Sequence, residues 1–275
     1  MNKIIYFINM YSISENYNEI KDIRNFLYKF NKYKIIYIPN PGNAGDSLIT
    51  FGTIKILNEL KLDWEYGNWQ NKYANELILY GGGGNLVGMY IEGKTFLNQN
   101  KDNNKIIVLP HTIKDEDEII KGLNNNVILI CREKKSYNYV KSIFKYENNL
   151  FLSKDMALYI KNVGTIKFGY GICNAFRTDP EKTDIQLPDD NLDISYHVCM
   201  ENNCDKNVIP VTYNLLKYLS QFRIINTNRL HICIAGHILG KQINLFPNNY
   251  WKNKEVYEYS LKNFRNIKFI DHVYY

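Results

Sequence analysis

Short apolar runs that alternate with helical patterns are the feature of this sequence that most limits its fold. Lys34–Ile38 reads as a strand and is followed, after a loop, by an amphipathic helical pattern over Asp46–Leu60. Further apolar runs occur at Leu77–Tyr80, Ile106–Leu109 and Val127–Cys131, each followed by a turn signal or a helical pattern. Strands and helices that alternate at this spacing indicate parallel sheets in an α/β architecture.

The second half of the chain is less regular but continues the same alternation. Residues 180–207 are rich in Asp, Asn and Pro and are expected to be mostly loop. The elements expected after that loop are a helix (Val211–Leu219), a strand (Arg223–Asn226), a helix (His231–Leu239), a strand (Gln242–Phe246), a helix (Lys254–Phe264) and a strand (Ile267–Ile270). We therefore predict two Rossmann-like lobes with parallel sheets and a cleft between them, the N-terminal lobe over residues 1–165 and a smaller C-terminal α/β lobe over residues 166–275.

The positive charge of the chain is spread along the sequence rather than concentrated. The net charge is +6 over 275 residues, and no block of Lys and Arg stands out. Proteins that bind nucleic acid usually carry a basic stripe or cluster, so we expect no nucleic-acid partner. A modest positive surface instead suits an anionic substrate or loose contact with a membrane face.

Cysteine content and the N-terminus indicate a cytoplasmic protein. The five cysteines form no paired framework, and their odd number argues against the disulfide scaffold of a small secreted protein. We expect them to be buried or incidental thiols. The apolar stretch within residues 1–10 is too short for a signal peptide, and no run reaches the length that crosses a bilayer. Peripheral contact with the inner membrane face is compatible with this composition.

Basic side chains stand at three expected strand ends. His111 follows Pro110 after one apolar run, Arg132 closes another, and Arg229 and His231 stand at the head of an apolar helical segment. Open parallel sheets bind ligands at the carboxyl ends of their strands, so these residues suggest one anionic ligand held in a cleft. Arg can hold the anion, and His can move a proton near neutral pH. The alternatives are a structural role for His111 and pairing with the adjacent carboxylate for Arg132.

Two glycine-rich segments also fall at expected strand ends. Gly42–Asp46 lies between a strand and a helix, where backbone N–H groups can meet an anion. A tight turn with Asp46 as the helix N-cap explains it equally well, and the segment is neither a Walker loop nor a dinucleotide fingerprint. The run Gly81–Gly84 costs roughly 0.5–1 kcal/mol of conformational entropy per glycine relative to Ala in regular structure. That cost favours a loop that faces a ligand over a simple bend.

Several charged residues have both a structural and a functional interpretation. Asp155 could cap a helix or contribute to a site. Arg177, Asp179 and Glu181 alternate after an apolar run, which fits a solvated strand edge about as well as it fits a site. Both alternatives stay open for these residues.

Taken in order, these segments resemble the polysaccharide pyruvyl transferase family. The resemblance runs from about residue 40 to residue 265 and rests on the order and spacing of short motifs: Gly42-Asn43-Ala44-Gly45-Asp46, the Gly81–Gly84 run, Leu109-Pro110-His111, Arg132-Glu133-Lys134 with Ser136, Asp155-Met156-Ala157, Arg177 with Asp179 and Glu181, and Thr227-Asn228-Arg229-Leu230-His231. The family usually reads Thr-Asp-Arg-Leu-His-Gly at the last motif, whereas this chain has Asn228 and Ile232.

The resemblance implies a fold similar to the GT-B glycosyltransferase type. It also implies transfer of the enolpyruvyl group of phosphoenolpyruvate to a sugar of a surface polysaccharide or of its lipid-linked precursor, with a pyruvate ketal as product. Phosphoenolpyruvate would be the donor substrate, with no further cofactor and no metal. Its carboxylate and phosphate groups match guanidinium groups in a bidentate way.

The same resemblance implies roles for individual residues. The residues implied to be catalytic are His231, as the acid, together with His111 and Asp46. The residues implied to bind phosphoenolpyruvate are Arg132, Arg229, Leu230, His231, Gly82, Gly83 and Gly84. The residues implied on the acceptor side are Asn43, Asp46, Asn85 and Asp155.

Two other functions fit the same pattern. One is a glycosyltransferase of the GT-B type that uses a nucleotide sugar, whose diphosphate the glycine segments and Arg229 could cradle. The other is a non-catalytic glycan-binding or assembly protein, suggested by Asn228, Ile232 and the short second lobe. Stabilisation by phosphoenolpyruvate rather than by a nucleotide sugar distinguishes the two enzyme classes.

Overall fold

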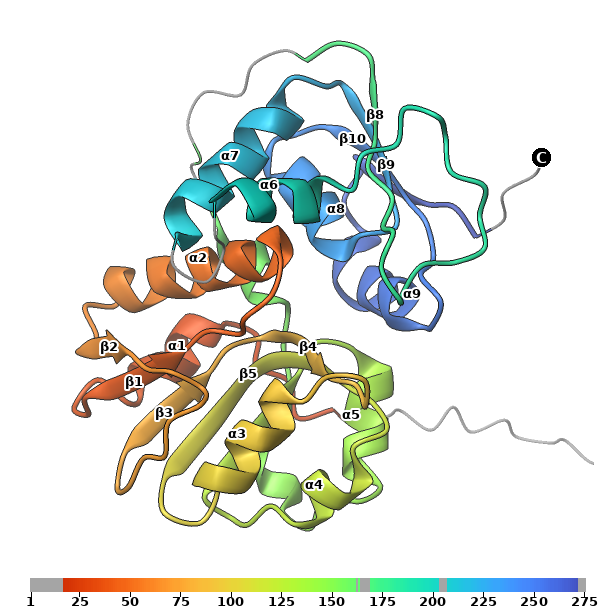
Figure 1. The fold of residues 1–275 in the computed structure, drawn as a ribbon. Coiled ribbons are helices and arrows are strands. Elements are labelled where there is room, and N and C mark those ends of the chain that lie inside the picture. The colour runs from red at the N-terminus through yellow and green to blue at the C-terminus, as the bar shows by residue number, and fades with distance from the viewer. Residues whose placement is uncertain (1–16, 162, 164–168, 203–206, 272–275) are drawn as a thin grey trace, which may run out of the picture.

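Two α/β lobes, stacked one above the other in Figure 1, make up the computed structural model. The structure describes residues 17–161, 163, 169–202 and 207–271. Within these residues, the N-terminal lobe is built on a seven-stranded sheet and the C-terminal lobe on a four-stranded sheet. The prediction of an α/β protein with parallel sheets is confirmed.

The N-terminal sheet is parallel throughout its described strands. These strands are β1 (Ile35–Ile38), β2 (Trp64–Tyr66), β3 (Leu77–Tyr80), β4 (Gly83–Leu86), β5 (Lys105–Ile113), β6 (Val127–Cys131) and β7 (Leu150–Leu152). Their order is β2-β1-β3-β5-β6-β7, with β4 beside β5. From β1 the chain passes to β2 on one side and then to β3 on the other side of β1. Where the direction of the strand order reverses in this way, a crevice opens at the carboxyl ends of the strands.

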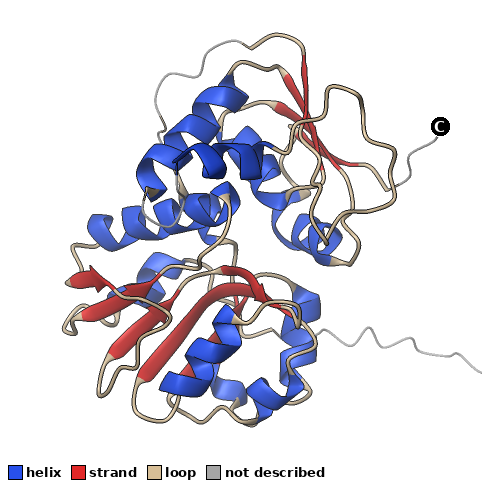
Figure 2. Ribbon diagram, viewed as in Figure 1, coloured by secondary structure: helices blue, strands red, loops and turns tan. Residues whose placement is uncertain are grey.

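Helices cover both faces of this sheet (Figure 2). Alternate residues of β1 divide the core, since Ile36 and Ile38 belong to one apolar cluster and Ile35 and Tyr37 to the other. The helices that pack on the first face are α3 (Glu92–Asn100), α4 (Asp117–Lys121) and α5 (Lys134–Lys141). The helices that pack on the second face are α1 (Ile23–Tyr28) and α2 (Ala44–Glu59). Short 3-10 turns, η1 (Glu147–Asn149) and η2 (Met156–Tyr159), flank β7.

The C-terminal lobe repeats this design on a smaller scale. Its strands are β8 (Ile172–Asn174), β9 (Ile224–Thr227), β10 (Gln242–Leu245) and β11 (Ile267–Phe269), parallel and in the order β11-β10-β9-β8. Its helices are α6 (Ile194–Asn202), α7 (Val208–Ser220), α8 (Leu230–Ile238) and α9 (Lys252–Val256), with the π-helical turn η3 (Tyr257–Leu261) after α9. The turn from β9 into α8 places Arg229 and His231 at the carboxyl edge of the sheet.

Helix α2 joins the two lobes. It packs against α6, α7 and α8 of the C-terminal lobe as well as against η2, and one apolar cluster runs through it from lobe to lobe. A Cβ at Gly52 would lie 2.5 Å from the carbonyl oxygen of Met156, so glycine permits this close approach. The helix is therefore buried on nearly all sides, and the expected amphipathic pattern is wrong. The boundary predicted between residues 165 and 166 lies outside the described residues.

Two other local predictions fail for physical reasons. Strand β5 does not end at His111 but continues to Ile113. Pro110 is tolerated inside it because the pairing register shifts between Val108 and His111, where a missing N–H donor breaks no regular ladder. The expected loop over residues 180–207 contains the helix Ile194–Asn202, because apolar residues on a polar background bury one side of it.

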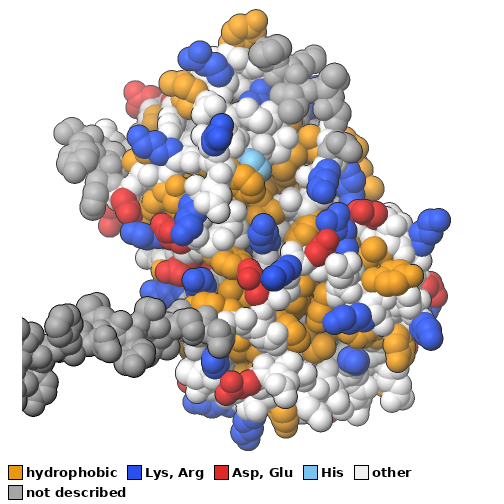
Figure 3. Space-filling view, turned by 180° about the vertical axis from the view of Figure 1, so that it is seen from behind, with side chains coloured by type: hydrophobic (Ala, Val, Ile, Leu, Met, Phe, Trp, Pro, Cys, Tyr) orange, Lys and Arg blue, Asp and Glu red, His pale blue; other side chains and the backbone are white. Residues whose placement is uncertain are grey.

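The surface charges, the helix lengths and the cysteines can be compared with the predictions from composition. Lys and Arg side chains are interspersed with Asp and Glu on the face shown in Figure 3, as expected for a protein without a basic stripe. In the described ranges, no helix has both the length and the apolar character that a membrane span needs.

Cys131, Cys173 and Cys233 are buried free thiols as expected, whereas Cys199 is disulfide-bonded, contrary to that expectation. Residues 1–10, on which the signal-peptide prediction rests, lie outside the described residues.

Candidate active site

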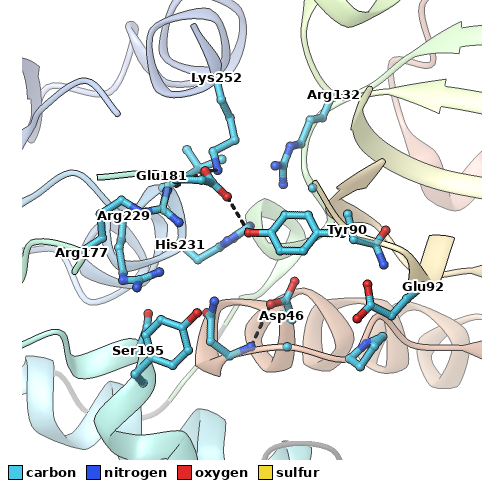
Figure 4. A pocket seen from close by; sticks show the side chains of 17 residues that line it. Asp46, Tyr90, Glu92, Arg132, Arg177, Glu181, Ser195, Arg229, His231 and Lys252 are labelled. Carbon is cyan, nitrogen blue, oxygen red and sulfur yellow. Dashed lines mark hydrogen bonds and ion pairs between the residues drawn. The ribbon is translucent and has the colours of Figure 1, made fainter. Parts of the chain in front are cut away.

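A cavity of about 280 Å³ lies between the lobes (Figure 4). It is bordered by the first turns of α2 and α8 and by the segments that follow β3 and β6. Of the predicted site residues, those that line it are Asn43, Asp46, Gly84, Asn85, Arg132, Arg229, Leu230 and His231. The prediction that Arg132, Arg229 and His231 converge from distant parts of the chain is confirmed.

Arg132 enters the cavity from the N-terminal lobe. Its side chain is 1% exposed, and its Nε donates a hydrogen bond to Thr112 Oγ1 at 2.8 Å while Nη1 donates to Asp155 Oδ2 at 2.9 Å. Nη2 has no hydrogen-bond partner among the described residues. A Cβ at Gly84 would lie 3.2 Å from this Nη2, so glycine at that position leaves room for the guanidinium. Nε and Nη1 are thus engaged by the protein, and Nη2 is available to a ligand.

Asp155 ties Arg132 to His231. His231 Nε2 lies 3.2 Å from Asp155 Oδ2, the same oxygen that accepts from Arg132, and Asp155 also caps η2 by accepting from Ala157 N at 2.9 Å. Burial alone would raise the pKa of Asp155, but His231 and Arg132 hold it well below its usual value. Asp155 is completely buried and stands behind the lining residues, so its predicted place on the acceptor side is wrong. The predicted cap is confirmed, at a 3-10 turn, and Asp155 also contacts two residues that line the cavity, Arg132 and His231.

The segment Gly42–Asp46 forms the opposite wall. The Asn43 side chain accepts from Gly45 N at 2.8 Å, and Asn43 N donates to Asp46 Oδ2 at 3.0 Å, which makes a capping box for α2. A Cβ at Gly42 would lie 2.2 Å from Asp46 Oδ2, and a Cβ at Gly45 would lie 3.0 Å from His231 Nδ1. Gly45 therefore lets the first turns of α2 and α8 approach each other, and Gly42 leaves room for the Asp46 carboxylate in the capping box. Burial raises the pKa of Asp46, although its side chain still reaches the cavity.

The four glycines do not act as one ligand loop. Only Gly84 lines the cavity, and Gly83 and Gly84 belong to β4. A Cβ at Gly82 would lie 2.8 Å from the carbonyl oxygen of Pro110, and a Cβ at Gly83 would lie 2.7 Å from Asn40 Nδ2. Gly82 and Gly83, which the resemblance placed in donor binding, instead allow neighbouring strand ends to pack closely.

His111 lies behind the cavity rather than in it. Its ring is completely buried, and its Nε2 lies 3.0 Å from Asn85 Oδ1 and 3.2 Å from Asn85 N. Asn85 Nδ2 donates to Tyr80 Oη at 2.8 Å, and Asn85 itself lines the cavity. Burial, with the positive charge of Arg132, lowers the pKa of His111 to about 3. His111 is therefore neutral near pH 7 and reaches the cavity only through Asn85.

The C-terminal wall is a buried ionic cluster. Arg177 donates to both carboxylate oxygens of Asp179 at 2.7 Å and to Glu181 Oε2 at 2.7 Å. Arg229 donates to Asp193 from Nε and Nη2 and to Asp179 Oδ2 at 3.0 Å, and its Cζ lies 4.9 Å from the ring centroid of Tyr196. Arg177 and Glu181 are each 4% exposed, so the solvated strand edge is the wrong alternative for this segment.

Lys252 and Tyr90 complete the cavity and were not found from the sequence. Lys252 Nζ forms an ion pair with Glu181, and burial lowers the pKa of Lys252 to about 8 despite that partner. Tyr90, from the N-terminal lobe, donates to Glu181 Oε1 at 3.1 Å across the cavity, as the dashed line in Figure 4 shows. Neither residue belongs to a recognisable motif. The lining residues Glu92, Ser195 and Tyr196 were missed for the same reason.

The two helix ends that meet at the cavity differ in how they are capped. Asn43 and Asp46 cap α2, whereas α8 has Arg229 at its N-cap and no side-chain cap hydrogen bond. The first N–H groups of α8 are thus left for a ligand, beside Arg132 Nη2 and His231. Within the described residues, no group of three or more His, Cys, Asp and Glu side chains could hold a metal ion. The arrangement can bind a small anion and present an imidazole to it.

Fold and site together define a two-lobed α/β protein with a cationic cavity between its lobes. The family model described as polysaccharide pyruvyl transferase matches residues 43–250, which include both helix ends and most of the cavity. The chain belongs to the polysaccharide pyruvyl transferase family. Family membership supports a pyruvyl transferase activity directed at a polysaccharide.

Two known proteins are similar to this chain over most of its length. EpsO of Bacillus subtilis (strain 168), which is provisionally named a pyruvyl transferase, is 24% identical to this chain over an alignment of 287 residues, gaps included. The match covers 87% of this chain and 89% of EpsO. A crystal structure of KP1_0663 from Klebsiella pneumoniae subsp. pneumoniae NTUH-K2044, described as an uncharacterised protein, is similar with a TM-score of 0.79 and 31% identity. That match covers 91% of this chain and 97% of the Klebsiella chain.

Proposed function

We propose that the protein transfers the enolpyruvyl group of phosphoenolpyruvate to a sugar of a surface polysaccharide or its lipid-linked precursor, forming a pyruvate ketal. The observation that carries this proposal is the meeting of Arg132, His231 and the uncapped first turn of α8 in one small cavity. A doubly anionic metabolite needs donors on two sides, and these groups come from different lobes. We further propose that the reaction takes place in the cytoplasm.

The donor is held by the groups that still have free hydrogen-bond capacity. Arg132 Nη2 and the N–H groups at the start of α8 face the same space, and a helix N-terminus favours an anionic group. Arg229 contributes less than its charge suggests, because two of its three nitrogens already donate to Asp179 and Asp193. Leu230 supplies a backbone N–H and an apolar surface for the methylene end of the donor.

His231 is the group that supplies the proton. A proton from His231 adds to the methylene carbon of phosphoenolpyruvate and makes C2 electron-poor. A sugar hydroxyl then forms a bond to C2 and gives its proton to Asp46, which passes it to the phosphate oxygen as the bond between C2 and that oxygen breaks and phosphate leaves. A second hydroxyl bonds to C2 to close the ketal, and its proton passes through the again ionised Asp46 to solvent, from which His231 is protonated again. In sum, one phosphoenolpyruvate and one diol give one ketal and one phosphate, with general-acid help worth about 10²–10⁴-fold.

Asp155 and His111 act through their neighbours. Asp155 is ionised because His231 and Arg132 lower its pKa, so it orients the imidazole and stabilises its charged form. His111 fixes Asn85, which lines the cavity, through contacts of 3.0 and 3.2 Å. Both are positioning residues in this mechanism, and the catalytic groups are His231 and Asp46.

A thermal-shift comparison tests the donor. Phosphoenolpyruvate at 100 times its dissociation constant should add about 2.7 kcal/mol to the free energy of unfolding and raise the melting temperature. UDP-glucose and GDP-mannose serve as nucleotide-sugar probes and should produce no shift. Phosphate release on addition of a polysaccharide acceptor then reports turnover. A shift with a nucleotide sugar and none with phosphoenolpyruvate would favour a glycosyltransferase.

A further inference from the structure

A second cavity, of about 460 Å³, opens directly beside the cationic one. The two cavities share a wall that includes Asn43, Asp46 and Glu92. A molecule in one cavity therefore lies next to a molecule in the other, with these side chains at the point of contact. The volume falls within the range of about 300–1,000 Å³ that is usual for small-molecule sites.

The second cavity has a different chemistry from the first. None of the residues that line it is Lys, Arg or His. Apart from the shared wall, it offers amides, hydroxyls and one indole, contributed by Asn40, Ser47, Thr50, Asn68, Trp69 and Gln70. Uncharged donors and acceptors of this kind suit a neutral polyhydroxyl ligand, and they give an anion no counter-charge.

The loop that carries Trp69 is fixed by hydrogen bonds. Gly67 N donates to the carbonyl oxygen of Tyr37 at 2.8 Å, and Asn68 N donates to Tyr73 Oη at 2.8 Å. Gln70 N donates to Asn68 Oδ1 at 2.9 Å. Trp69 is half-buried and packs against the apolar cluster of the N-terminal sheet. Its position is thus set by the fold, while part of the ring stays accessible.

We propose that the second cavity binds the acceptor as a neutral hexopyranose unit, with the C–H face of the sugar ring against Trp69 and its reacting hydroxyls at the shared wall. This assignment rests on the proposed function, which places the donor in the cationic cavity. An indole supplies a large rigid apolar surface for a sugar ring, and the amides of Asn68 and Gln70 recognise its hydroxyls. The attacking hydroxyl loses its proton to Asp46 as its oxygen bonds to C2 of the donor.

Saccharide binding by saturation-transfer NMR tests the site without requiring turnover. The probes are the methyl glycosides of glucose, galactose, mannose and the neutral N-acetylhexosamines. The wild-type protein should bind at least one of them, and Trp69→Ala should weaken that binding about tenfold or more, which corresponds to about 1.4 kcal/mol. Trp69→Phe should retain most of the affinity. Trp64→Ala is the matched control, because Trp64 is a half-buried indole of the same lobe that lines neither cavity.

The stabilisation by phosphoenolpyruvate separates this inference from the donor assignment. A shift of the melting temperature in Trp69→Ala equal to that of the wild type shows an intact fold and donor cavity. If Trp69→Ala does not fold, the exposed Gln70→Ala replaces it and should weaken saccharide binding a few-fold. Unchanged binding by both variants, or no binding of any probe by the wild type, overturns the acceptor cavity. Trp69-dependent binding without stabilisation by phosphoenolpyruvate contradicts the donor assignment alone.

Discussion

The two lobes contribute positive charge to the cavity in different ways. In the N-terminal lobe, Arg132 has one carboxylate partner, Asp155, and keeps Nη2 free among the described residues. In the C-terminal lobe, three cations share three carboxylates in one buried cluster. The cations of that cluster are Arg177, Arg229 and Lys252, and its carboxylates are Asp179, Glu181 and Asp193.

This difference shows that a count of basic residues overstates what a ligand can use. When a buried cation is paired with carboxylates, their attraction offsets the cost of desolvating the charge and holds the side chains of the wall in place. Such a cation has few hydrogen-bond donors left for a substrate. Arg132, His231 and the uncapped end of α8 are the groups with capacity left. We therefore expect variants of the two walls to behave differently.

The largest effect is expected at His231. His231→Gln removes the proton donor and should lower kcat by about 10²–10⁴-fold while leaving stabilisation by phosphoenolpyruvate largely intact. Steady-state phosphate release and thermal shift measure the two properties. His237→Gln is the control on the same helix, since His237 stacks on Phe264 and lines neither cavity. Turnover within tenfold of wild type for His231→Gln would remove His231 as the acid.

On the N-terminal wall of the cavity, substitution of Arg132 is expected to have the largest effect on the free energy of unfolding. Arg132→Met leaves the buried Asp155 with His231 as its only side-chain partner among the described residues, besides the backbone N–H of Ala157, and should lower the free energy of unfolding by about 3 kcal/mol, the lower end for breaking a buried pair. Because the pKa of Asp155 is lowered from its ordinary 3.8, this contribution is complete above pH 3.8 and is lost as the pH falls further. Denaturant unfolding at pH 7 and at lower pH measures both.

A surface pair provides the control for this effect. The partly exposed pair of Arg24 with Asp22 should contribute no more than about 1 kcal/mol, so Arg24→Met should be nearly neutral. Adding Asp155→Leu to Arg132→Met should recover part of the lost stability, because the uncompensated carboxylate is gone. Equal destabilisation by Arg132→Met and Arg24→Met would contradict the contrast between the buried pair and the surface pair.

Lys252 should make the other wall sensitive to alkaline pH. Because its pKa is lowered to about 8, Lys252 loses its charge as the pH rises through that value. Glu181 then keeps one cation partner fewer, the cavity becomes more negative, and the affinity for the anionic donor should fall by up to about tenfold per pH unit. The unfolded chain keeps its proton up to about pH 10.5, so stability should rise with pH over the same window. Lys252→Arg should retain affinity at alkaline pH, and Lys254→Arg, exposed and paired with Asp271, should not. Parallel pH profiles for both variants would contradict this role.

Removal of the hydrogen bond that joins the two walls, from Tyr90 to Glu181, should have the smallest effect on the reaction. Tyr90→Phe removes the hydrogen bond to Glu181, worth about 1 kcal/mol, and should raise the KM for phosphoenolpyruvate a few-fold with little change in kcat. Tyr139→Phe serves as the control, because Tyr139 makes a similar bond to Asp117 on the surface. A large loss of kcat in Tyr90→Phe would instead indicate a direct part in the chemistry.

The fold could be predicted where local pattern decides it. Strands Leu77–Tyr80 and Val127–Cys131 coincide with the predicted runs, because buried parallel strands are apolar on both faces. Strand β5 extends past Pro110 because a register shift in its pairing with β6 accommodates the proline, and no local pattern shows that shift. Helix α2 appears amphipathic in sequence but is enclosed by the second lobe, which is a tertiary effect.

The site residues, too, could be predicted only where local sequence determines their position. Arg132, Arg229 and His231 were predictable because they follow the carboxyl ends of two apolar strands, and such ends meet in a parallel sheet protein. Lys252 and Tyr90 were not predictable, since their importance comes from Glu181, which is far from both in sequence. Asp155 was assigned to the wrong side because its burial beneath Arg132 and His231 depends on the packing of η2.

A crystal structure with bound phosphoenolpyruvate tests the central claim most directly. We predict electron density for the donor in the cavity between the lobes, with one anionic group on Arg132 Nη2, another at the first turn of α8, and the methylene carbon facing His231. Density at any other place, with Arg132 and His231 not contacting the ligand, would contradict the account.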